Sequence, residues 1–326
     1  MQNAGLGEPI VELPVVGRHI QDHPAVGLVF QVNPPLVADI VAEYKHFSNW
    51  TEGRKLERYP LSFGYPGFST GAFLHSGLKD PDDSSSRQEL PDLQLTVFPL
   101  MIEPHISKRV STSCIPSMMP ECILTPPHPR SFDKYLEITY NRVLVTAAVV
   151  NPRTEYTVRL SPACAESGGK CDDGQDDDYD DPSQPELSHD PSQPELYHDH
   201  LDELDVARLV RGSEIIREIF DSDPLKTLVV GEVVPGKHVE GDEALALWVR
   251  DSHNSNSHWC CSTKMSQDRR SGAVDGDLKV FGVDNLYVGD ASVLPNIPNG
   301  NVHSTVVAVA SIWARRMASR FARKDL

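Results

Sequence analysis

A stretch without basic residues interrupts this chain and limits which parts of it can fold together. Between Cys171 and Ala207 there are 14 Asp and Glu residues and no Lys or Arg. Within this stretch the nonapeptide at 181–189 recurs, with one change, at 190–198. Such a composition cannot bury enough apolar surface to form a core. We therefore expect residues 163–200 to be a disordered, solvated insertion between two foldable parts.

The acidity of the chain is largely confined to residues 171–207. The formal net charge is −17, and subtracting the 14 acidic charges leaves −3 for the rest. The sequence has no basic patch with interleaved aromatic residues, so we expect no nucleic-acid partner. It also has no apolar run near the roughly 18 to 20 residues of a membrane span, so we expect no membrane partner.

Metal or disulfide chemistry in the insertion is a possible alternative to a purely solvated loop. Asp-rich runs can bind calcium, but the spacing lacks the residue order of an EF-hand loop, and we expect no metal site. Cys164 and Cys171 could close a small disulfide at its base, although thiols are the default. The adjacent Cys260 and Cys261 are a poor pair for one zinc ion.

The remaining sequence predicts an antiparallel sheet with helices. Apolar, β-branched segments predict strands at 25–32, 93–98, 135–139, 143–150 and 156–160, with a turn at 151–153 joining the last two. Helical periodicity and capping predict helices at 202–220, from the cap Asp242 to Trp248, and at 301–321. Two short strands are expected at 278–281 and 286–288.

A histidine in Ser257-His258-Trp259 is the first candidate for chemistry. A neutral imidazole can accept a hydroxyl proton because its unperturbed pKa lies near working pH. Taken alone, however, His258 also fits an ordinary surface or core histidine.

A loop with two prolines and one glycine, Pro295–Asn301, leads into the last predicted helix. The free N–H groups at a helix start stabilise developing negative charge. Asn301 could therefore be both the helix cap and the hydrogen-bond partner of a substrate oxygen. The alternative is that Asn301 is an N-cap and nothing more.

Four segments together resemble the glucose-methanol-choline (GMC) oxidoreductases. They are Val16–Pro24, similar to the family's V-G-x-N-L-Q-D-H/N-P segment, the hairpin Asn151–Leu160, the histidine segment Ser257–Met265, and Val280–Ser292. Within the family the chain is most similar to the flavin modules of fungal cellobiose dehydrogenases. The resemblance extends over nearly the whole chain except the insertion.

The resemblance implies FAD as cofactor and a role for each matching residue. His258 would be the catalytic base and Asn301 the second active-site residue, with His303 as its rival. Asp290 and Ala291 would lie along the ribityl and pyrophosphate part of FAD. Asn301 and Val302 would face the flavin, and the substrate would be a small alcohol or a sugar-like molecule.

The resemblance also implies a fold class and domain boundaries. The fold expected is α+β: an antiparallel-sheet substrate domain with helices, plus remnants of a Rossmann-like FAD domain contributed by both chain ends. Residues 1–24 would be the first remnant, 25–265 the substrate-binding domain containing the 163–200 insertion, and 266–326 the return to the FAD domain.

Two departures from the family pattern shape the functional expectation. The sequence has no G-x-G-x-x-G loop, which cradles the ADP half of FAD. Cys260-Cys261-Ser262 stands where the family often has Gly-Thr or Gly-Ser, and Ser257 where cellobiose enzymes have Asn, which weakens a sugar assignment. We expect a fragment or truncated gene product that oxidises an alcohol, with a partner supplying the missing FAD lobe. The alternatives are a non-catalytic or partner-dependent remnant and a non-redox cyclase on the same scaffold.

Overall fold

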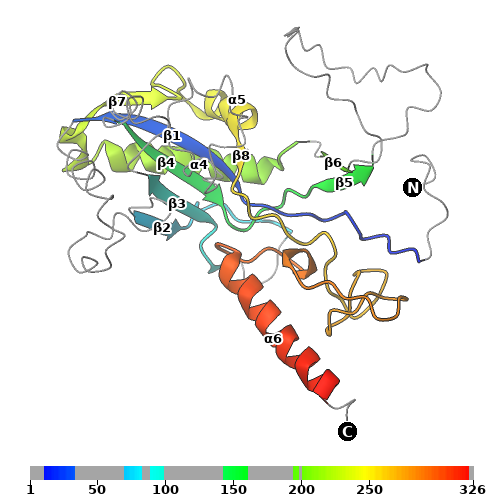
Figure 1. Ribbon diagram of the computed structural model, residues 1–326. Coiled ribbons are helices and arrows are strands. Elements are labelled where there is room, and N and C mark those ends of the chain that lie inside the picture. Colours follow the sequence, from blue (N-terminus) through cyan, green and yellow to red (C-terminus); the bar gives the residue numbers. More distant parts are fainter. Residues whose placement is uncertain are drawn as a thin grey trace, which may run out of the picture.

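The computed structural model describes residues 11–33, 70–82, 89–98, 142–160, 194–197 and 200–322. These residues form one large sheet with two helices against it, a small second sheet, and an irregular C-terminal region that ends in a long helix (Figure 1). The strand predicted at 135–139 and the pair Cys164 and Cys171 lie outside the described residues.

The main sheet is antiparallel, as the sequence predicts. Its strand order is β2-β3-β4-β1-β7, and β8 pairs with the start of β1. The predicted strands at 25–32, 93–98 and 143–150 are confirmed as β1, β3 and β4. The bounds are β1 Pro24–Val32, β2 Thr70–Leu74, β3 Leu93–Phe98, β4 Arg142–Val149, β7 Val229–Val234 and β8 Asn254–Ser255.

The second sheet corrects one expectation about the insertion. Its strands are β5 (Thr157–Leu160), which the sequence predicts, and β6 (Pro194–Tyr197). β6 lies inside the segment 163–200 that was expected to be disordered, and there the prediction is wrong. The strand forms because its backbone N–H and C=O groups pair with those of β5, with Val158 opposite Leu196. Residues 163–193 lie outside the described residues.

The described part of the chain contains three α-helices: α4 (Glu203–Phe220), α5 (Asp242–Ser252) and α6 (His303–Ala322). The start of α4 is as predicted, because the Asp202 side chain accepts a hydrogen bond from Leu204 N at 2.9 Å. For α5 the predicted cap is wrong: Gly241, with φ of 83°, is the N-cap and makes no side-chain hydrogen bond. The predicted strands at 278–281 and 286–288 form only isolated bridges.

The core lies between the main sheet and α4. Val26, Leu28 and Phe30 point to the same face of β1 because side chains alternate along a strand, and they pack in one cluster with Leu209 and Ile216 of α4. Figure 1 shows α4 lying along this face of the sheet, whereas α6 projects from the other side. The opposite face of the sheet is therefore left to the C-terminal region.

The observed architecture agrees with the expected α+β class and its antiparallel sheet. The Rossmann-like origin of the two chain ends, and the domain boundaries drawn from it, stay predictions. None of the helices in the described part of the chain has the length and apolarity needed to cross a bilayer.

Candidate active site

A buried carboxylate, Asp22, organises the centre of the site just before β1. Its Oδ1 accepts hydrogen bonds from the backbone N of His23 at 2.8 Å and of His258 at 2.7 Å. Its Oδ2 accepts a hydrogen bond from Ser255 Oγ. Burial raises the pKa of Asp22, and these hydrogen bonds act against that rise. Asp22 thereby holds two segments that are more than 200 residues apart in one fixed arrangement.

The neighbouring Gln21 fixes the proline-containing loop in the same way. Its Oε1 accepts a hydrogen bond from Ile297 N at 2.9 Å, and its backbone pairs with that of Cys260. Ile297 is buried with Cys260, Cys261 and Leu294 in a small apolar cluster. The loop before α6 and the His258 segment are therefore attached to the same short stretch of chain.

Two histidines from these segments are in direct contact. His23 Nδ1 lies 2.9 Å from His258 Nδ1, and the two rings are nearly perpendicular with centroids 5.0 Å apart. The other ring nitrogen of His23, Nε2, lies 3.0 Å from the carbonyl oxygen of Pro298. His23 thus links His258 to the loop that carries Asn301.

Both histidines are shifted toward the neutral form. Burial, with a smaller repulsion from His258, lowers the pKa of His23 to about 3, and the carbonyls of Pro298 and Val150 act in the opposite direction. Burial also lowers the pKa of His258. Both rings are therefore neutral near pH 7, where His258 has a nitrogen lone pair available to accept a proton.

The structure brings His258 and Asn301 together. Asn301 Nδ2 lies 3.1 Å from His258 Nε2, and Asn301 Oδ1 lies 3.2 Å from Nε2 of Gln94 on β3. The side chain of Asn301 is exposed, whereas His258 is partly buried. A small molecule can therefore reach the pair from the side of Asn301.

The sheet supplies the opposite wall of this site. Cross-strand pairing places Phe73, Gln94, Ala148 and Ala25 in one row across β2, β3, β4 and β1, on the face turned away from α4. A Cβ atom at Gly300 would lie 3.5 Å from Cζ of Phe73, so the loop before α6 packs against this row.

The other predicted site residues lie nearby in chain order but make different contacts. Asp290 caps the short 3-10 helix η9 (Ala291–Val293) by accepting from Ser292 N at 2.8 Å, and the Ala291 carbonyl accepts from Cys261 N. Val302 packs against the apolar cluster around Ile297. His303 is the first residue of α6 and is exposed. The side chain that contacts His258 Nε2, at 3.1 Å, is that of Asn301 and not that of His303.

Sequence reasoning did not select His23, Asp22 or Gln94 as site residues. The first two stand in the Val16–Pro24 segment that carries the family resemblance, so a signal for them was present. The sequence contains no such signal for Gln94, because a polar residue inside a predicted strand is expected to face solvent. Among the described residues, no group of three or more His, Cys, Asp and Glu side chains could hold a metal ion.

Comparison with known protein families identifies part of the chain. Residues 184–310 match the family model described as GMC oxidoreductase. This match confirms the GMC resemblance over the segment that contains His258 and Asn301.

Individual relatives match in the same way. The chloroplastic fatty acid photodecarboxylase of Chlamydomonas reinhardtii is 38% identical over 111 residues, which are 33% of this chain and 18% of that protein. The mitochondrial choline dehydrogenase of Mus musculus is 36% identical over 109 residues, which are 33% of this chain and 18% of that protein. The chain therefore aligns with only a small share of each relative.

The fold of nearly the whole chain occurs in solved structures of larger enzymes. The formate oxidase of Aspergillus oryzae, which contains FAD, superposes with a TM-score of 0.65 at 20% sequence identity. The superposition covers 96% of this chain and 49% of the oxidase, so the chain spans about half the length of that protein. At this identity the likeness shows the shared fold.

Proposed function

We propose that this chain forms the substrate side of a GMC-type oxidoreductase that oxidises the CH–OH group of a small alcohol with FAD. The observation that carries the proposal is the contact of a neutral His258 with an exposed Asn301 at 3.1 Å. In this proposal His258 Nε2 accepts the hydroxyl proton of the alcohol, and Asn301 Nδ2 donates a hydrogen bond to the alcohol oxygen. Both groups act on one substrate atom.

The desolvated surroundings of His258 suit this role. A base must be neutral before it accepts a proton, and burial lowers the pKa of His258 so that it stays neutral at pH 7. Asp22 holds the backbone of His258 from behind, so the ring keeps a fixed position as its charge changes. The protonated ring can donate from Nδ1 to His23, which contacts it at 2.9 Å.

The residues present fit the flavin-ring end of FAD. Gly289, Asp290, Asn301 and His303 are all exposed, and the first turn of α6 presents backbone N–H groups that suit an anionic ring edge. FAD, when bound, supplies the electron acceptor for the alcohol carbon. The ADP end requires a glycine-rich loop that this sequence lacks, so we place that loop in an FAD lobe of the same or another polypeptide.

The substrate is proposed only as a class. The names of similar proteins include choline dehydrogenase and formate oxidase, which act on small molecules. A sugar of the cellobiose type stays a prediction from the sequence.

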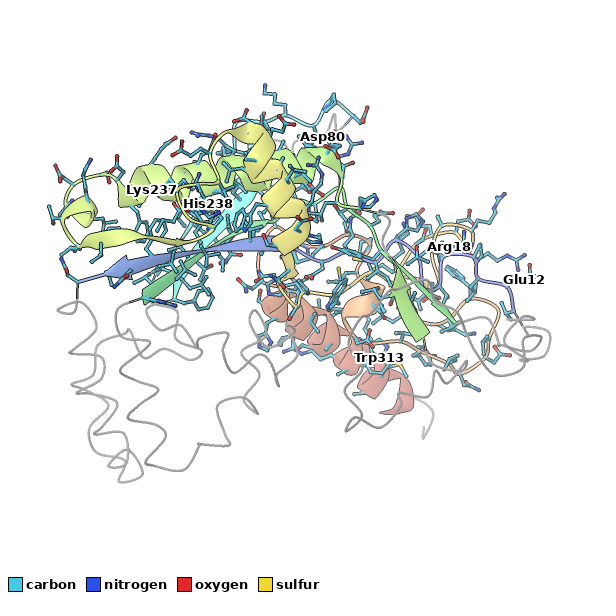
Figure 2. The ribbon with its side chains drawn as sticks, turned by 90° about the horizontal axis from the view of Figure 1, so that it is seen from above. Glu12, Arg18, Asp80, Lys237, His238 and Trp313 are labelled. Carbon is cyan, nitrogen blue, oxygen red and sulfur yellow. The ribbon has the colours of Figure 1, made fainter. Side chains whose placement is uncertain are left out.

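A second candidate function, a partner-dependent binding module, has its own supporting observation. Val307 and Ile312 on α6 are 50% and 54% exposed, although Trp313 on the same helix packs against the C-terminal region (Figure 2). A helix with apolar residues on two faces is suited to burial between two layers. This favours an FAD lobe or another protein on the outer face of α6, with or without catalysis.

One experiment separates these functions. The chain is purified with its natural partners, and the visible spectrum is recorded before and after addition of FAD. We expect bound flavin that small alcohols reduce, and we expect the Val307→Lys variant to lose the flavin-loaded form while Leu247→Lys, at an exposed site on α5, keeps it. A preparation that stays colourless with FAD but still contains a partner protein would support the binding module instead.

A further inference from the structure

Gln94 combines a hydrogen bond into the site with a buried atom that has no partner. Its Nε2 lies 3.2 Å from Asn301 Oδ1, but its Oε1 is buried and has no hydrogen-bond partner among the described residues. Turning the amide by 180° would leave the nitrogen unpaired instead. An unpaired buried polar group costs roughly 1–3 kcal/mol, so packing alone gives no reason for a glutamine here.

Gln94 is the last of a series of contacts that starts at the Pro298 carbonyl and runs through His23, His258 and Asn301. The donor and acceptor in each contact follow from the Pro298 end of this series. The carbonyl oxygen of Pro298 can only accept, so His23 Nε2, at 3.0 Å, must carry a proton. A neutral His23 then has its lone pair on Nδ1. The 2.9 Å contact between the two Nδ1 atoms therefore requires the proton of His258 to be on Nδ1.

The same reasoning continues through Asn301 to Gln94. A neutral His258 with a proton on Nδ1 has its lone pair on Nε2, so Asn301 must present its amide nitrogen there. Asn301 Oδ1 then faces Gln94, which must donate from Nε2. In the structure the Asn256 Nδ2 atom lies 3.3 Å from His258 Nδ1. Because a protonated Nδ1 needs an acceptor, the Asn256 amide is assigned the orientation turned by 180°, with its oxygen toward that proton.

We propose that Gln94 is a positioning residue that holds the Asn301 amide with its N–H groups toward His258 Nε2. The lone pair of His258 Nε2 favours this orientation of the Asn301 amide from one side, and the donor at Gln94 favours it from the other, so loss of the Gln94 donor lowers the cost of turning the amide. A turned amide would present Oδ1 to His258 and favour a proton on Nε2, which blocks the lone pair. The catalytic role of Gln94 rests on the proposed function, but the orientation that Gln94 gives to the Asn301 amide does not.

The test measures the protonation of the two ring nitrogens of His258 by nitrogen-15 NMR at neutral pH, in the full chain without flavin. The spectrum of His258→Gln assigns the signals. We expect a protonated Nδ1 and an unprotonated Nε2 in the wild type. Gln94→Glu offers only an acceptor to Asn301, so we expect its Nε2 signal to move toward the protonated type, and a smaller shift in Gln94→Met.

Gln31 on β1 provides the matched control, because it is an exposed glutamine in the same sheet. Gln31→Glu and Gln31→Met should leave the His258 signals unchanged. If the Gln94 variants also retain the wild-type signals, the positioning role is wrong. Gln94→Met also removes an unpaired buried acceptor, so we expect it to fold and to decide the question if Gln94→Glu does not fold.

Activity of the flavin-loaded protein gives an independent readout. Gln94→Met should lower kcat about tenfold or more with a smaller change in KM, and Gln94→Glu should shift the acidic limb of the kcat/KM profile to higher pH. Predicted NMR shifts in a protein that never reduces flavin would refute the proposed function alone. Normal turnover with unchanged NMR signals in both variants would refute the role of Gln94 alone.

Discussion

The two faces of the main sheet differ in what their side chains contribute. On the face toward α4, large apolar residues such as Leu28 and Leu93 are completely buried in the core. The other face presents Ala25, Ala148 and Gln94, with His23 just before the strand. The first face stabilises the fold and the second holds the candidate site, so substitutions on the two faces should separate stability from activity.

The largest effect is expected on the site face, at His258. We expect His258→Gln to lower kcat of the flavin-loaded protein by roughly 10²–10⁴-fold, because a positioned base contributes about that much. The measurement is steady-state turnover with a small alcohol. His238→Gln, an exposed histidine beyond β7, is the control and should retain wild-type turnover (Figure 2). If His258→Gln turns over within a few-fold of the wild-type rate, His258 is not the catalytic base.

On the core face the largest effect should be on stability. Leu209 is fully buried in α4, and we expect Leu209→Ala to lower the free energy of unfolding by about 2–5 kcal/mol. Denaturant unfolding measures this, with the exposed Leu247→Ala on α5 as control. The His258 ring signals should stay unchanged. A loss below about 1 kcal/mol would mean that α4 is not packed on the sheet as described.

Gly212 of α4 provides a second test of packing on the core face. A Cβ atom there would lie 2.8 Å from Cβ of Ala147, so α4 and β4 are in very close contact. In an exposed helix Gly→Ala stabilises by about 1 kcal/mol, but here we expect Gly212→Ala to destabilise by about 1–3 kcal/mol. A variant more stable than wild type in thermal unfolding would contradict this contact.

The smallest expected effect, taken per pH unit, is the pH dependence of stability that His23 introduces. The pKa of folded His23 is about 3, below the ordinary value of 6.5, so the unfolded chain binds more protons between these values. Stability is therefore complete above about pH 6.5 and falls as pH drops toward 3, by at most about 1.4 kcal/mol per pH unit.

The His23→Asn variant tests this effect. Urea unfolding at pH 7, 6 and 5 should show a smaller loss of stability per pH unit in the variant than in wild type. Some pH dependence should remain, because burial lowers the pKa of His258 in the same direction. An unchanged slope would show that His23 is not held neutral by burial.

The sequence predicted those elements whose own pattern determines them. β1 and β3 are runs of β-branched and apolar residues, and α4 begins at a side-chain cap, so local sequence was sufficient. β2 (Thr70–Leu74) was missed because its short Gly-containing segment becomes a strand only through pairing with β3. β6 was missed because composition predicts the absence of a core, not the absence of backbone pairing.

The candidate site was predicted in part for a related reason. His258 and Asn301 were found through their motifs, and the structure brings them within 3.1 Å. The pairing of His258 with His23 depends on a contact across 235 positions, which no local pattern encodes. Gln94 enters the site only through the register of β3, which places it opposite Phe73 and Ala148.

The most direct measurement is the anaerobic reduction of bound FAD by small alcohols, followed in the visible spectrum, with the chain assembled with its FAD lobe. We predict that alcohol bleaches the flavin of the wild-type protein. We predict that His258→Gln binds flavin equally well but bleaches roughly 10²–10⁴-fold more slowly. Bleaching of the variant at the wild-type rate, or a flavin-loaded wild type that no alcohol reduces, would contradict the role proposed for the His258 and Asn301 pair.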